Sequence, residues 1–473
     1  MDAAGLAAGA RLRFRHLLTN HDASPQAVDE QGIAVARPGG ARHACRDHGE
    51  LGRITRMAQH EADVLILGGG VIGLACAYHL LARGRNVTVL DQGQVGGGSS
   101  HGNCGTLTPS HAMPLAMPGV VGTALRWLLK RDAPLRIKPR LDPGLLRWLE
   151  AFRRRCNWKD FAAATAVKSP LLLRSNELIA GMVEREKLDC EYQAIGSLHV
   201  YRDRKALAAS SWYARTLTEV GVPVESLDGA RIESMEAALK PGVAGGYFNP
   251  ADAQLRPDRF VDELARVVRE RGGRIEEHSC ISAITLGRGR IAKVRTSGGD
   301  YSANEVVFAL GAWSPALARP IGLRLPIQPG KGYSITYSRP QTCPRLPLTL
   351  KEASVCVTAW DSGFRLGSTM EFAGYDSSLN RTRLDALRRS SAIYLHEPEG
   401  GQMQEEWYGW RPMTPDDLPI LGRVQGIDNL CMATGHGMLG VTLSAVTGLL
   451  VSEVIAGEKP SFDLAPFNVS RFA

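Results

Sequence analysis

The pattern of apolar and polar positions predicts buried parallel strands joined by helices. Residues 64–67 are a continuous apolar run and residues 87–90 are a second, mostly apolar one, as expected for strands that are buried on both faces. The stretch between them, residues 71–84, has the length of a helix and ends at a glycine. A helix and strands of the same kind return much later, at residues 259–273, 274–284 and 301–310. We therefore expect two distant parts of the chain to contribute to one sheet.

A second group of predicted strands has a different pattern. These segments alternate apolar and polar positions or are rich in aromatic residues, which predicts a mixed or antiparallel sheet with turns between its strands. They are residues 196–201, 246–249, 333–337, 355–360, 364–372 and 405–411. Helices are predicted between some of them, at residues 169–187 and 205–220. We expect this sheet to form a second, α+β domain.

Glycines link the first predicted strand to its helix. Gly68, Gly70 and Gly73 form the pattern GxGxxG. Gly68 permits a tight turn, Gly70 lets the backbone approach a pyrophosphate, and Gly73 lets the helix pack closely against the strand. The first turn of the helix, with Val71 and Ile72, would then direct its backbone NH groups at the phosphates. This arrangement predicts a dinucleotide site of the Rossmann type.

An acidic residue after the second strand narrows the choice of dinucleotide. Asp91 follows Gly73 by 18 residues, the distance at which a carboxylate accepts hydrogen bonds from the adenosine ribose. An acid at this place disfavours a 2′-phosphate, so the dinucleotide is FAD or NAD. An NAD enzyme would continue with further strand–helix units, whereas a loop rich in Gly and Ser follows Asp91 here. The pattern favours FAD and a glutathione-reductase-like Rossmann domain of the α/β class, interrupted by the mixed-sheet domain.

The loop SSHGNCGTLTPSHAMPLAMPG, residues 99–119, contains residue types that bind metals. His101, Cys104 and His111 lie within it, but no other cluster of Cys and His completes a coordination shell. We therefore predict no metal site and interpret the loop as a cradle for the flavin. A covalent link between Cys104 and the flavin stays open as an alternative.

Composition limits the remaining classes of function. The net charge of +8 is spread over the chain without aromatic residues between the basic clusters, which argues against a nucleic-acid partner. Nine irregularly spaced cysteines favour reduced thiols in a cytoplasmic protein. Residues 1–56 carry eight arginines and six acidic residues without periodicity, and we interpret them as a disordered or non-native N-terminal extension before Met57.

Five segments spread over most of the chain match one family in order. They are GGGVIGLACAYHLLARG, the loop at residues 99–119, PGKGYSIT at 329–336, GWRPMTPDDLPILGR at 409–423 and ATGHGMLGVTLS at 433–444. On these segments the chain resembles the D-amino acid oxidase superfamily, and within it the bacterial FAD-dependent D-amino acid dehydrogenases and proteins similar to D-hydroxyproline dehydrogenase. The resemblance implies an FAD-binding domain from residues 61–118, 256–325 and 411–473. Residues 119–255 and 326–410 would form the substrate domain.

The resemblance also implies which residues bind FAD. It places the loop residues against the pyrophosphate and the ring, the backbone of Ile281 at the adenine, and the segment after residue 433 against the ring. Beyond the glycine motif and Asp91, the cofactor residues that it implies are Ser99, Ser100, Asn103, Gly105, Ile281, Gly311, Gly435, Gly437, Met438 and Leu439.

Arg411, in GWRP, is the first catalytic candidate. The arginine of the matching family motif grips the substrate carboxylate, and a guanidinium can do so through two parallel hydrogen bonds. The alternative is a structural arginine that pairs with Asp416 or Asp417 in the same loop.

Two further candidates are less specific. His436 is predicted at the start of an apolar helix that runs to about residue 455, where the helix N-terminus would stabilise negative charge on the reduced ring; it could instead be a cap without a chemical role. Tyr333, like Tyr408 and Trp410, could line the substrate pocket, but packing in the core is at least as common for such aromatic residues.

The activity that the resemblance implies is oxidative deamination of a D-amino acid. Hydride would pass from Cα to flavin N5, leaving an imino acid that water converts to a 2-oxo acid and ammonia. The electrons would go to a quinone or another acceptor, with contact at the inner face of the membrane left open. The alternatives are a dehydrogenase or oxidase of a cyclic or secondary amine such as D-proline or hydroxy-D-proline, and a non-catalytic electron-transfer subunit. An NAD-dependent dehydrogenase is disfavoured by the split domain.

Overall fold

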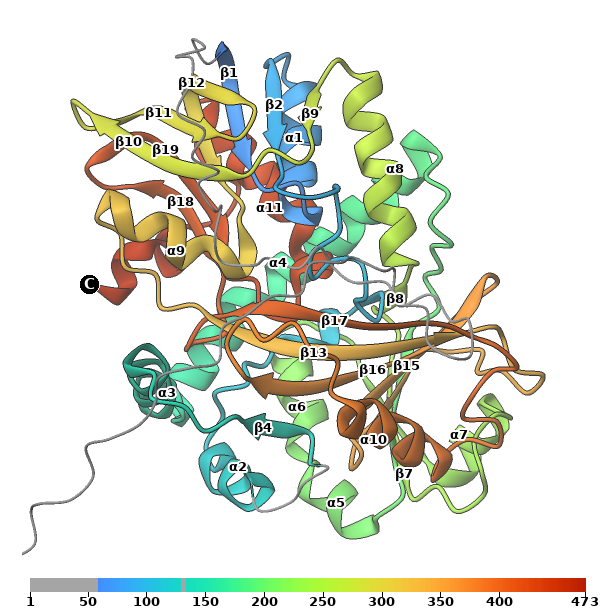
Figure 1. The fold of residues 1–473 in the computed structure, drawn as a ribbon. Helices are drawn as coiled ribbons and strands as arrows, with labels where there is room; N and C mark the ends of the chain where they lie inside the picture. Colours follow the sequence, from blue (N-terminus) through green and yellow to red (C-terminus); the bar gives the residue numbers. More distant parts are fainter. Residues whose placement is uncertain (1–57, 129–132) are drawn as a thin grey trace, which may run out of the picture.

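The computed structural model describes residues 58–128 and 133–473, which form two large β-sheets surrounded by helices (Figure 1). The first sheet lies at the top of Figure 1, and the second crosses the molecule below it. The predicted N-terminal extension, residues 1–56, lies outside the described residues. Within the described ranges, no helix is both long and apolar enough to cross a lipid bilayer.

The first sheet contains the strands predicted around the glycine motif. Its strand order is β10-β11-β12-β1-β2-β9. Strand β19 also pairs with β12, and β18 pairs with β19. The central strands β9, β2, β1, β12 and β19 are parallel, whereas β10, β11 and β18 join in antiparallel pairs. The strands are β1 (Gln59–Leu67), β2 (Val87–Leu90), β9 (Arg274–Glu276), β10 (Ile281–Gly287), β11 (Arg290–Thr296), β12 (Gly299–Phe308), β18 (Ile420–Val424) and β19 (Ile427–Thr434).

The predicted strand at residues 274–284 is two strands, β9 and β10. The chain leaves the sheet between them because its backbone bonds to the end of β2 instead. His278 donates its backbone NH to the Gly93 carbonyl at 3.1 Å, and Ser279 donates to the Asp91 carbonyl at 2.7 Å. This turn brings the segment before Ile281 next to Asp91.

The helices beside the first sheet form its main apolar core. Helix α1 (Val71–Ala82) contacts both α8 (Pro257–Glu270) and α11 (Gly440–Ile455). Val64 of β1 and Leu74 of α1 are fully buried in this core. Helix α1 is therefore stabilised by apolar side chains that pack against the sheet on one side and against α11 on another.

The second sheet has the order β17-β13-β16-β15-β14-β5-β7-β6, with β4 beside β16. Most pairs are antiparallel, but β14 with β5 and β16 with β4 are parallel, as the prediction of a mixed sheet allowed. The strands are β4 (Leu135–Ile137), β5 (Ser197–Tyr201), β6 (Glu225–Asp228), β7 (Gly245–Asn249), β13 (Gln328–Tyr337), β14 (Leu348–Leu350), β15 (Val355–Trp360), β16 (Gly363–Phe372) and β17 (Met403–Met413). A two-stranded sheet of β3 (Thr106–Leu107) and β8 (Ala253–Gln254) lies apart from both.

Two helical predictions differ from the structure. The helix predicted at residues 169–187 begins earlier, as α4 (Trp158–Glu186), since Asn157 caps it by accepting a hydrogen bond from the Asp160 NH. The helix predicted at 205–220 is two helices that break at Ser210, whose hydroxyl bonds back to the Leu207 carbonyl. The remaining helices are α2 (Val120–Leu128), α3 (Pro143–Arg155), α5 (Arg204–Ala209), α6 (Trp212–Glu219), α7 (Gly229–Met235), α9 (Ser314–Ala318) and α10 (Arg381–Ala392).

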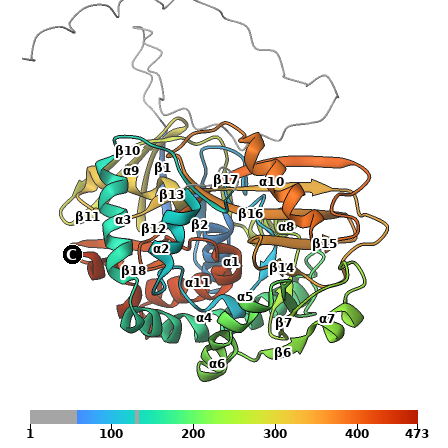
Figure 2. The ribbon, with the colours of Figure 1, turned by 90° about the horizontal axis from the view of Figure 1, so that it is seen from below.

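The predicted domain boundaries do not coincide with the packing at two places. Helix α4, predicted in the substrate domain, lies beside α11 in Figures 1 and 2, and its Ile179 and Met182 are buried in the core of the first sheet. Strand β17 continues through the predicted boundary at residue 411 to Met413. Packing of the apolar face of α4 on the first sheet explains the first difference, and pairing with β13 explains the second.

Candidate active site

The glycine motif forms the turn between β1 and α1. Gly68 has a φ of +107°, and a Cβ at this position would overlap the Ala309 carbonyl. A Cβ on Gly73 would overlap the Gly68 carbonyl, so the helix approaches the strand as closely as predicted. Gly70 is the N-cap residue of the helix, and because glycine has no side chain it cannot cap the first NH groups. The first NH groups of α1, such as that of Ile72, are therefore positioned to bind phosphate, whereas the Val71 NH donates to the Ser100 hydroxyl.

Asp91 lies at the end of β2 with its carboxylate held by backbone groups. Its Oδ2 accepts a hydrogen bond from the Gly69 NH at 2.8 Å, and its Oδ1 accepts one from the Gly93 NH at 2.9 Å. Burial raises the pKa of Asp91 above its usual value, although the two backbone NH groups oppose this. No lysine or arginine of the described chain forms an ion pair with Asp91, which leaves it available for ribose hydroxyls.

The predicted cofactor residues from four separate segments meet at the carboxyl ends of parallel strands. Asp91 follows β2, Gly68 follows β1, Gly311 follows β12 and Gly435 follows β19. Thr434 donates its hydroxyl to the Gly311 carbonyl at 3.2 Å, which ties two of these ends together. In an open α/β sheet, ligands bind at this edge. The geometry thus fits a dinucleotide that extends across the strand ends.

The loop after Asp91 closes over the start of α1. Ser100, next to Ser99, accepts a hydrogen bond at its hydroxyl from the Val71 NH at 3.2 Å. Asn103 accepts one at Oδ1 from the Gly105 NH at 2.8 Å. Gly105 has a φ of +73°, and a Cβ there would overlap the Leu255 carbonyl, so only glycine fits this turn. These contacts place the predicted loop residues beside the nucleotide turn.

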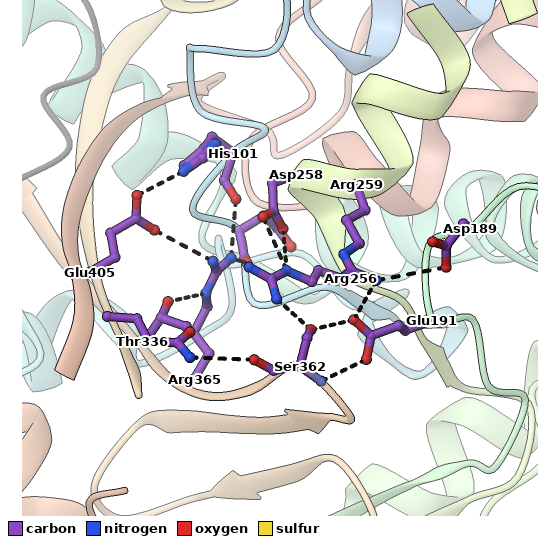
Figure 3. A network of polar contacts seen from close by, with 12 residues as sticks. His101, Asp189, Glu191, Arg256, Asp258, Arg259, Thr336, Ser362, Arg365 and Glu405 are labelled. Atoms are coloured by element: carbon purple, nitrogen blue, oxygen red, sulfur yellow. Dashed lines mark hydrogen bonds and ion pairs between the residues drawn. The ribbon is translucent and has the colours of Figure 1, made fainter. Parts of the chain in front are cut away.

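Arg365 of β16 holds this loop, and the sequence analysis did not identify it. Its Nη1 donates to the carbonyls of Asn103 at 2.7 Å and His101 at 3.1 Å, and its Nε donates to the Thr336 hydroxyl at 2.9 Å. Glu405 lies 3.6 Å from Arg365 and also bonds His101 Nε2 at 2.8 Å (Figure 3). The signal was an arginine between Phe364 and Leu366 in a predicted strand, which indicates a buried charge with specific partners.

Arg411 lies on the face of the second sheet that the loop contacts. It pairs with Gly330 across β13 and β17, and its guanidinium lies over Gly332. Its Nη1 donates to the Thr369 carbonyl at 2.8 Å. Burial lowers the pKa of Arg411, because the charged form loses hydration. Among the described residues, no carboxylate forms an ion pair with this guanidinium.

A distortion of β16 provides the carbonyl that Arg411 binds. Thr369 has a φ of +57°, which is unusual for a β-branched residue, and the pairing of β13 with β16 shifts register beside it. Such strained backbone persists where the surrounding structure requires it and is common near functional sites. The distortion directs the Thr369 carbonyl toward Arg411 and fixes the position of the guanidinium.

The alternative partners of Arg411 are engaged elsewhere. Asp416 forms an ion pair with Arg471 at 2.8 Å, and Asp417 forms one with buried Lys168 at the same distance. The interpretation of Arg411 as a structural partner of either aspartate is therefore wrong.

Tyr333 does not lie beside Arg411. Successive residues of a strand point to opposite faces of the sheet, so Tyr333 and its partner Tyr408 point away from the face that carries Arg411. The Tyr333 hydroxyl donates to Glu371 at 2.5 Å, and burial raises the pKa of Tyr333. With Tyr408 and Trp410 it belongs to the apolar core on that face. The structure thus separates all three aromatic residues from the guanidinium.

His436 lies before α11 rather than within it, because the helix begins at Gly440. Its Nε2 is 3.0 Å from the Thr447 hydroxyl, and burial lowers the pKa of His436 to about 3, so the ring is neutral. The following residues approach β17: the Gly437 NH donates to the Pro412 carbonyl at 3.1 Å, whereas the side chain of Met438 is 37% exposed. The backbone from Gly435 to Leu439 therefore lies near Arg411, with the imidazole turned inward.

The described residues contain no group of three or more His, Cys, Asp or Glu side chains arranged to hold a metal ion. His101 instead pairs with Glu405, and Cys104 hydrogen-bonds to Cys356. This hydrogen bond, together with burial, raises the pKa of Cys104. His101 and Cys104, two of the loop residues that suggested a metal, therefore have other partners here.

The structure has the features of a two-domain, dinucleotide-dependent oxidoreductase. One sheet carries the glycine turn and Asp91, and the second sheet carries Arg411, which has no carboxylate partner among the described residues. Comparison with known families is specific: the chain belongs to the DAO family of FAD-dependent oxidoreductases, whose model matches residues 63–454. FAD is the cofactor of this family, and the turn at Gly68, the N-terminus of α1 and the carboxylate of Asp91 fit it. The predicted fold class and cofactor are confirmed.

Relatives and solved structures agree with this assignment. The chain is 34% identical over 418 residues to the D-amino acid dehydrogenase of Rhizorhabdus wittichii, covering 86% of this chain and 100% of the relative. It is equally similar to the D-amino acid dehydrogenase of Bradyrhizobium diazoefficiens, over 87% of this chain and 99% of the relative. Glycine oxidase from Geobacillus kaustophilus has the same fold, with a TM-score of 0.71 and 24% identity over 87% of this chain and 99% of that one. L-proline dehydrogenase from P. horikoshii follows with a TM-score of 0.69 and 18% identity, over 88% and 98%.

Proposed function

We propose that this protein is a D-amino acid dehydrogenase, which oxidises the substrate with its FAD and passes the electrons to a quinone or another acceptor. The observation that carries the proposal is Arg411, a half-buried guanidinium without a carboxylate partner among the described residues, beside the loop that covers the nucleotide turn. A cation in such a place favours an anionic ligand, because the ligand restores the charge balance. The names of the relatives support an amino acid as this ligand.

The residues of the chain would orient the substrate rather than exchange protons with it. Arg411 would hold the α-carboxylate with its free NH groups, while the Thr369 carbonyl keeps the guanidinium in place. FAD, when bound, supplies the acceptor for the two electrons that leave the Cα–H bond. The substrate loses two electrons and two protons and becomes an imino acid, which water hydrolyses to a 2-oxo acid and ammonia. Tyr333 and His436 have other partners, so no proton transfer is assigned to them.

An anaerobic spectrum of the holoenzyme tests the proposed function. Addition of D-amino acids should bleach the flavin absorbance near 450 nm, whereas the L-enantiomers should leave it unchanged. Bleaching by D-proline or hydroxy-D-proline but by no primary D-amino acid would instead support a dehydrogenase of cyclic amines. A flavin that none of these compounds reduces would refute the proposal and favour an electron-transfer subunit. Reoxidation by a soluble quinone rather than by oxygen would support the acceptor that we propose.

Substitution of Arg411 tests the carboxylate contact separately. Two charge-assisted hydrogen bonds are worth roughly 3 kcal/mol together, so Arg411→Ala should lower kcat/KM on the order of 100-fold, mainly through KM. Arg411→Lys should recover only part of this loss, since an ammonium cannot form the parallel pair of bonds. Arg324→Ala, at an exposed arginine, is the matched control and should leave KM unchanged. An unchanged KM in Arg411→Ala with FAD still bound would refute the assignment.

We also propose that a surface of α2 and α3 contacts anionic lipid. Leu125 and Leu128 of α2 and Leu146 of α3 are 61%, 41% and 64% exposed, and Arg126 and Arg147 are exposed among them. Helix α2 lies below α3 in Figure 1 and packs on β4. Exposed leucines next to arginines favour an interface with anionic headgroups. Vesicles with phosphatidylglycerol should sediment the protein and neutral vesicles should not; equal recovery with both would refute this contact.

A further inference from the structure

A row of residues across the second sheet faces the flavin loop. Adjacent strands pair these residues directly, so their side chains share one face of the sheet. From β17 to β5, the row consists of Trp407, Ser334, Gly367, Cys356, Thr349 and His199. The loop touches this face twice, since Gly102 lies against the Trp407 ring and the Cys104 sulfur lies over Gly367. The face that carries His199 is therefore the face on which the substrate would lie.

Lys351 is a cation on this face without an ion-pair partner among the described residues. It follows Thr349 by two residues, and its backbone NH continues the pairing with β5 by donating to the Val200 carbonyl at 3.1 Å. Burial lowers the pKa of Lys351, and its ammonium forms no ion pair or hydrogen bond with a described residue. The neighbouring Glu352 raises the pKa of Lys351 through its charge but forms no ion pair with it, because its carboxylate accepts hydrogen bonds from the Arg202 backbone NH and the Tyr394 hydroxyl.

His199 is a second polar group on this face without a hydrogen-bonding partner. Its side chain is 1% exposed, and neither ring nitrogen has a hydrogen-bond partner among the described residues. Its ring stacks on His111 at a centroid distance of 5.6 Å and lies 5.1 Å from the Tyr213 ring. The Lys351 ammonium lies 5.8 Å from the same Tyr213 ring, so both unpartnered groups lie beside one aromatic side chain. A buried imidazole without partners costs about 1–3 kcal/mol, which a ligand could recover.

The histidine opposite His199 is fixed by a separate network. Ser110, the residue before His111, donates its NH and its hydroxyl to Asp252 at 3.0 and 2.6 Å, and Ser197 donates to the same carboxylate at 2.6 Å. Burial raises the pKa of Asp252 to about 6, against these three hydrogen bonds. Asp252 is thus occupied in anchoring the loop and does not bond Lys351.

The row of residues links His199 and Lys351 to the part of the sheet that carries Arg411. Cys356 occupies the same row as His199, and the charges of both Arg411 and Lys351 lower the pKa of Cys356, in addition to the larger effect of its hydrogen bond from Cys104. The Arg411 guanidinium lies over Gly332 of β13, two residues before Ser334 of the row, whereas Lys351 follows β14 on the other side of Cys356. Arg411 and Lys351 therefore flank Cys356 on the sheet face where the substrate would lie.

We propose that Lys351 and His199 form a subsite for a carboxylate at the end of the substrate side chain. Together with Arg411, the subsite selects a dicarboxylic D-amino acid of the aspartate or glutamate type. This inference rests on the proposed function, because it assigns the second end of the same substrate. A carboxylate would accept hydrogen bonds from both the Lys351 ammonium and a His199 NH, and it would neutralise the half-buried cation. A hydroxyl or an apolar side chain would leave that charge uncompensated.

Binding of unreactive acids to the holoenzyme tests the subsite without turnover. Succinate and glutarate mimic the two carboxylates of the substrate, and propionate and butyrate have only one. Their Kd values follow from the change that each acid causes in the flavin absorbance. We expect at least one diacid to bind ten-fold or more tightly than its monoacid. Lys351→Met should abolish this preference and leave the Kd of the monoacids within two-fold, whereas Lys159→Met, at an exposed lysine of α4, should change neither.

Substrate oxidation separates failure of the subsite from failure of the proposed function. We expect kcat/KM for D-aspartate or D-glutamate to exceed that for D-alanine ten-fold or more, and His199→Leu to reduce this ratio. Equal bleaching by D-alanine and the acidic D-amino acids would overturn the subsite while leaving the proposed function intact. A preference for hydroxy-D-proline would overturn it as well. A wild-type holoenzyme that binds diacids and monoacids equally would overturn it even if the Lys351 variant does not fold.

Discussion

Replacement of Arg365 by methionine should weaken FAD binding, although Arg365 lies on the substrate sheet. Its guanidinium is 1% exposed and joins β16 to the loop through the carbonyls of Asn103 and His101. Methionine has a similar length and can fill the space, but it donates no hydrogen bond. The variant would leave two loop carbonyls without their donor and Glu405 without one of its two cationic neighbours.

The expected magnitude follows from the contacts that are lost. Hydrogen bonds to a charged donor contribute roughly 1.5–3 kcal/mol each, and Arg365 makes one to each of Asn103, His101 and Thr336. Burial of the guanidinium lowers its pKa, which shows that desolvation offsets part of this gain. We take about 3 kcal/mol as the net loss, consistent with removal of one partner from a buried charged pair. If the loop must be ordered before FAD can bind, this loss corresponds to about a 100-fold rise in Kd.

Titration of the apoprotein with FAD, followed by quenching of flavin fluorescence, measures this effect. Thr336→Val is the graded control, because it removes only the hydrogen bond at 2.9 Å and should cost about 1 kcal/mol. Thermal unfolding of both apoproteins separates loss of fold from loss of affinity. An Arg365→Met protein that is folded and binds FAD as tightly as the wild type would show that the loop does not depend on this arginine.

Two further predictions concern the same loop. The hydrogen bond to Glu405 raises the pKa of His101 above its unfolded value, so the stability that it contributes is present below about pH 6.5 and is lost as the pH rises through the folded pKa. Between pH 6 and pH 9, the melting temperature of the wild type should therefore fall more than that of His101→Gln. Equal changes in the two melting temperatures over this pH range would contradict the prediction. Cys104 is a protonated thiol that is hydrogen-bonded to Cys356, so acid precipitation should leave FAD in the supernatant. Flavin in the wild-type pellet that is absent from that of Cys104→Ser would demonstrate the covalent link.

The nucleotide end of the molecule could be predicted because its determinants are local. Gly68, Gly73 and Asp91 act through backbone conformation and spacing along one strand–helix–strand unit, which the sequence displays directly. The end of α1 and the apolar strands around it follow from periodicity for the same reason. The division of the 274–284 segment into two strands was missed, because it depends on hydrogen bonds to residues that lie far away in the chain.

The substrate end could be predicted only in part. Arg411 was found through the family motif. The face of the sheet to which each neighbouring side chain points depends on strand register, and the register places Tyr333 on the face opposite to the Arg411 guanidinium. Arg365, Lys351 and His199 carry no motif. Their significance lies in which partners they have or lack, and this becomes visible only when β5, β14, β15 and β16 are aligned in one sheet.

The cations near the loop differ in how their charge is compensated. This difference distinguishes the cations that stabilise the fold from those that are available to bind a ligand. Lys168 has Asp417 at 2.8 Å, and Arg365 has two carbonyls, a hydroxyl and Glu405, so each is satisfied by the fold itself. Arg411 has one carbonyl, and Lys351 has no polar partner among the described residues. Partial burial of a charge is costly unless the charge is paired, so a fold that keeps two half-buried cations unpaired on one face favours a compensating ligand. One carboxylate would satisfy Arg411 alone, whereas a substrate with two carboxylates would satisfy both cations.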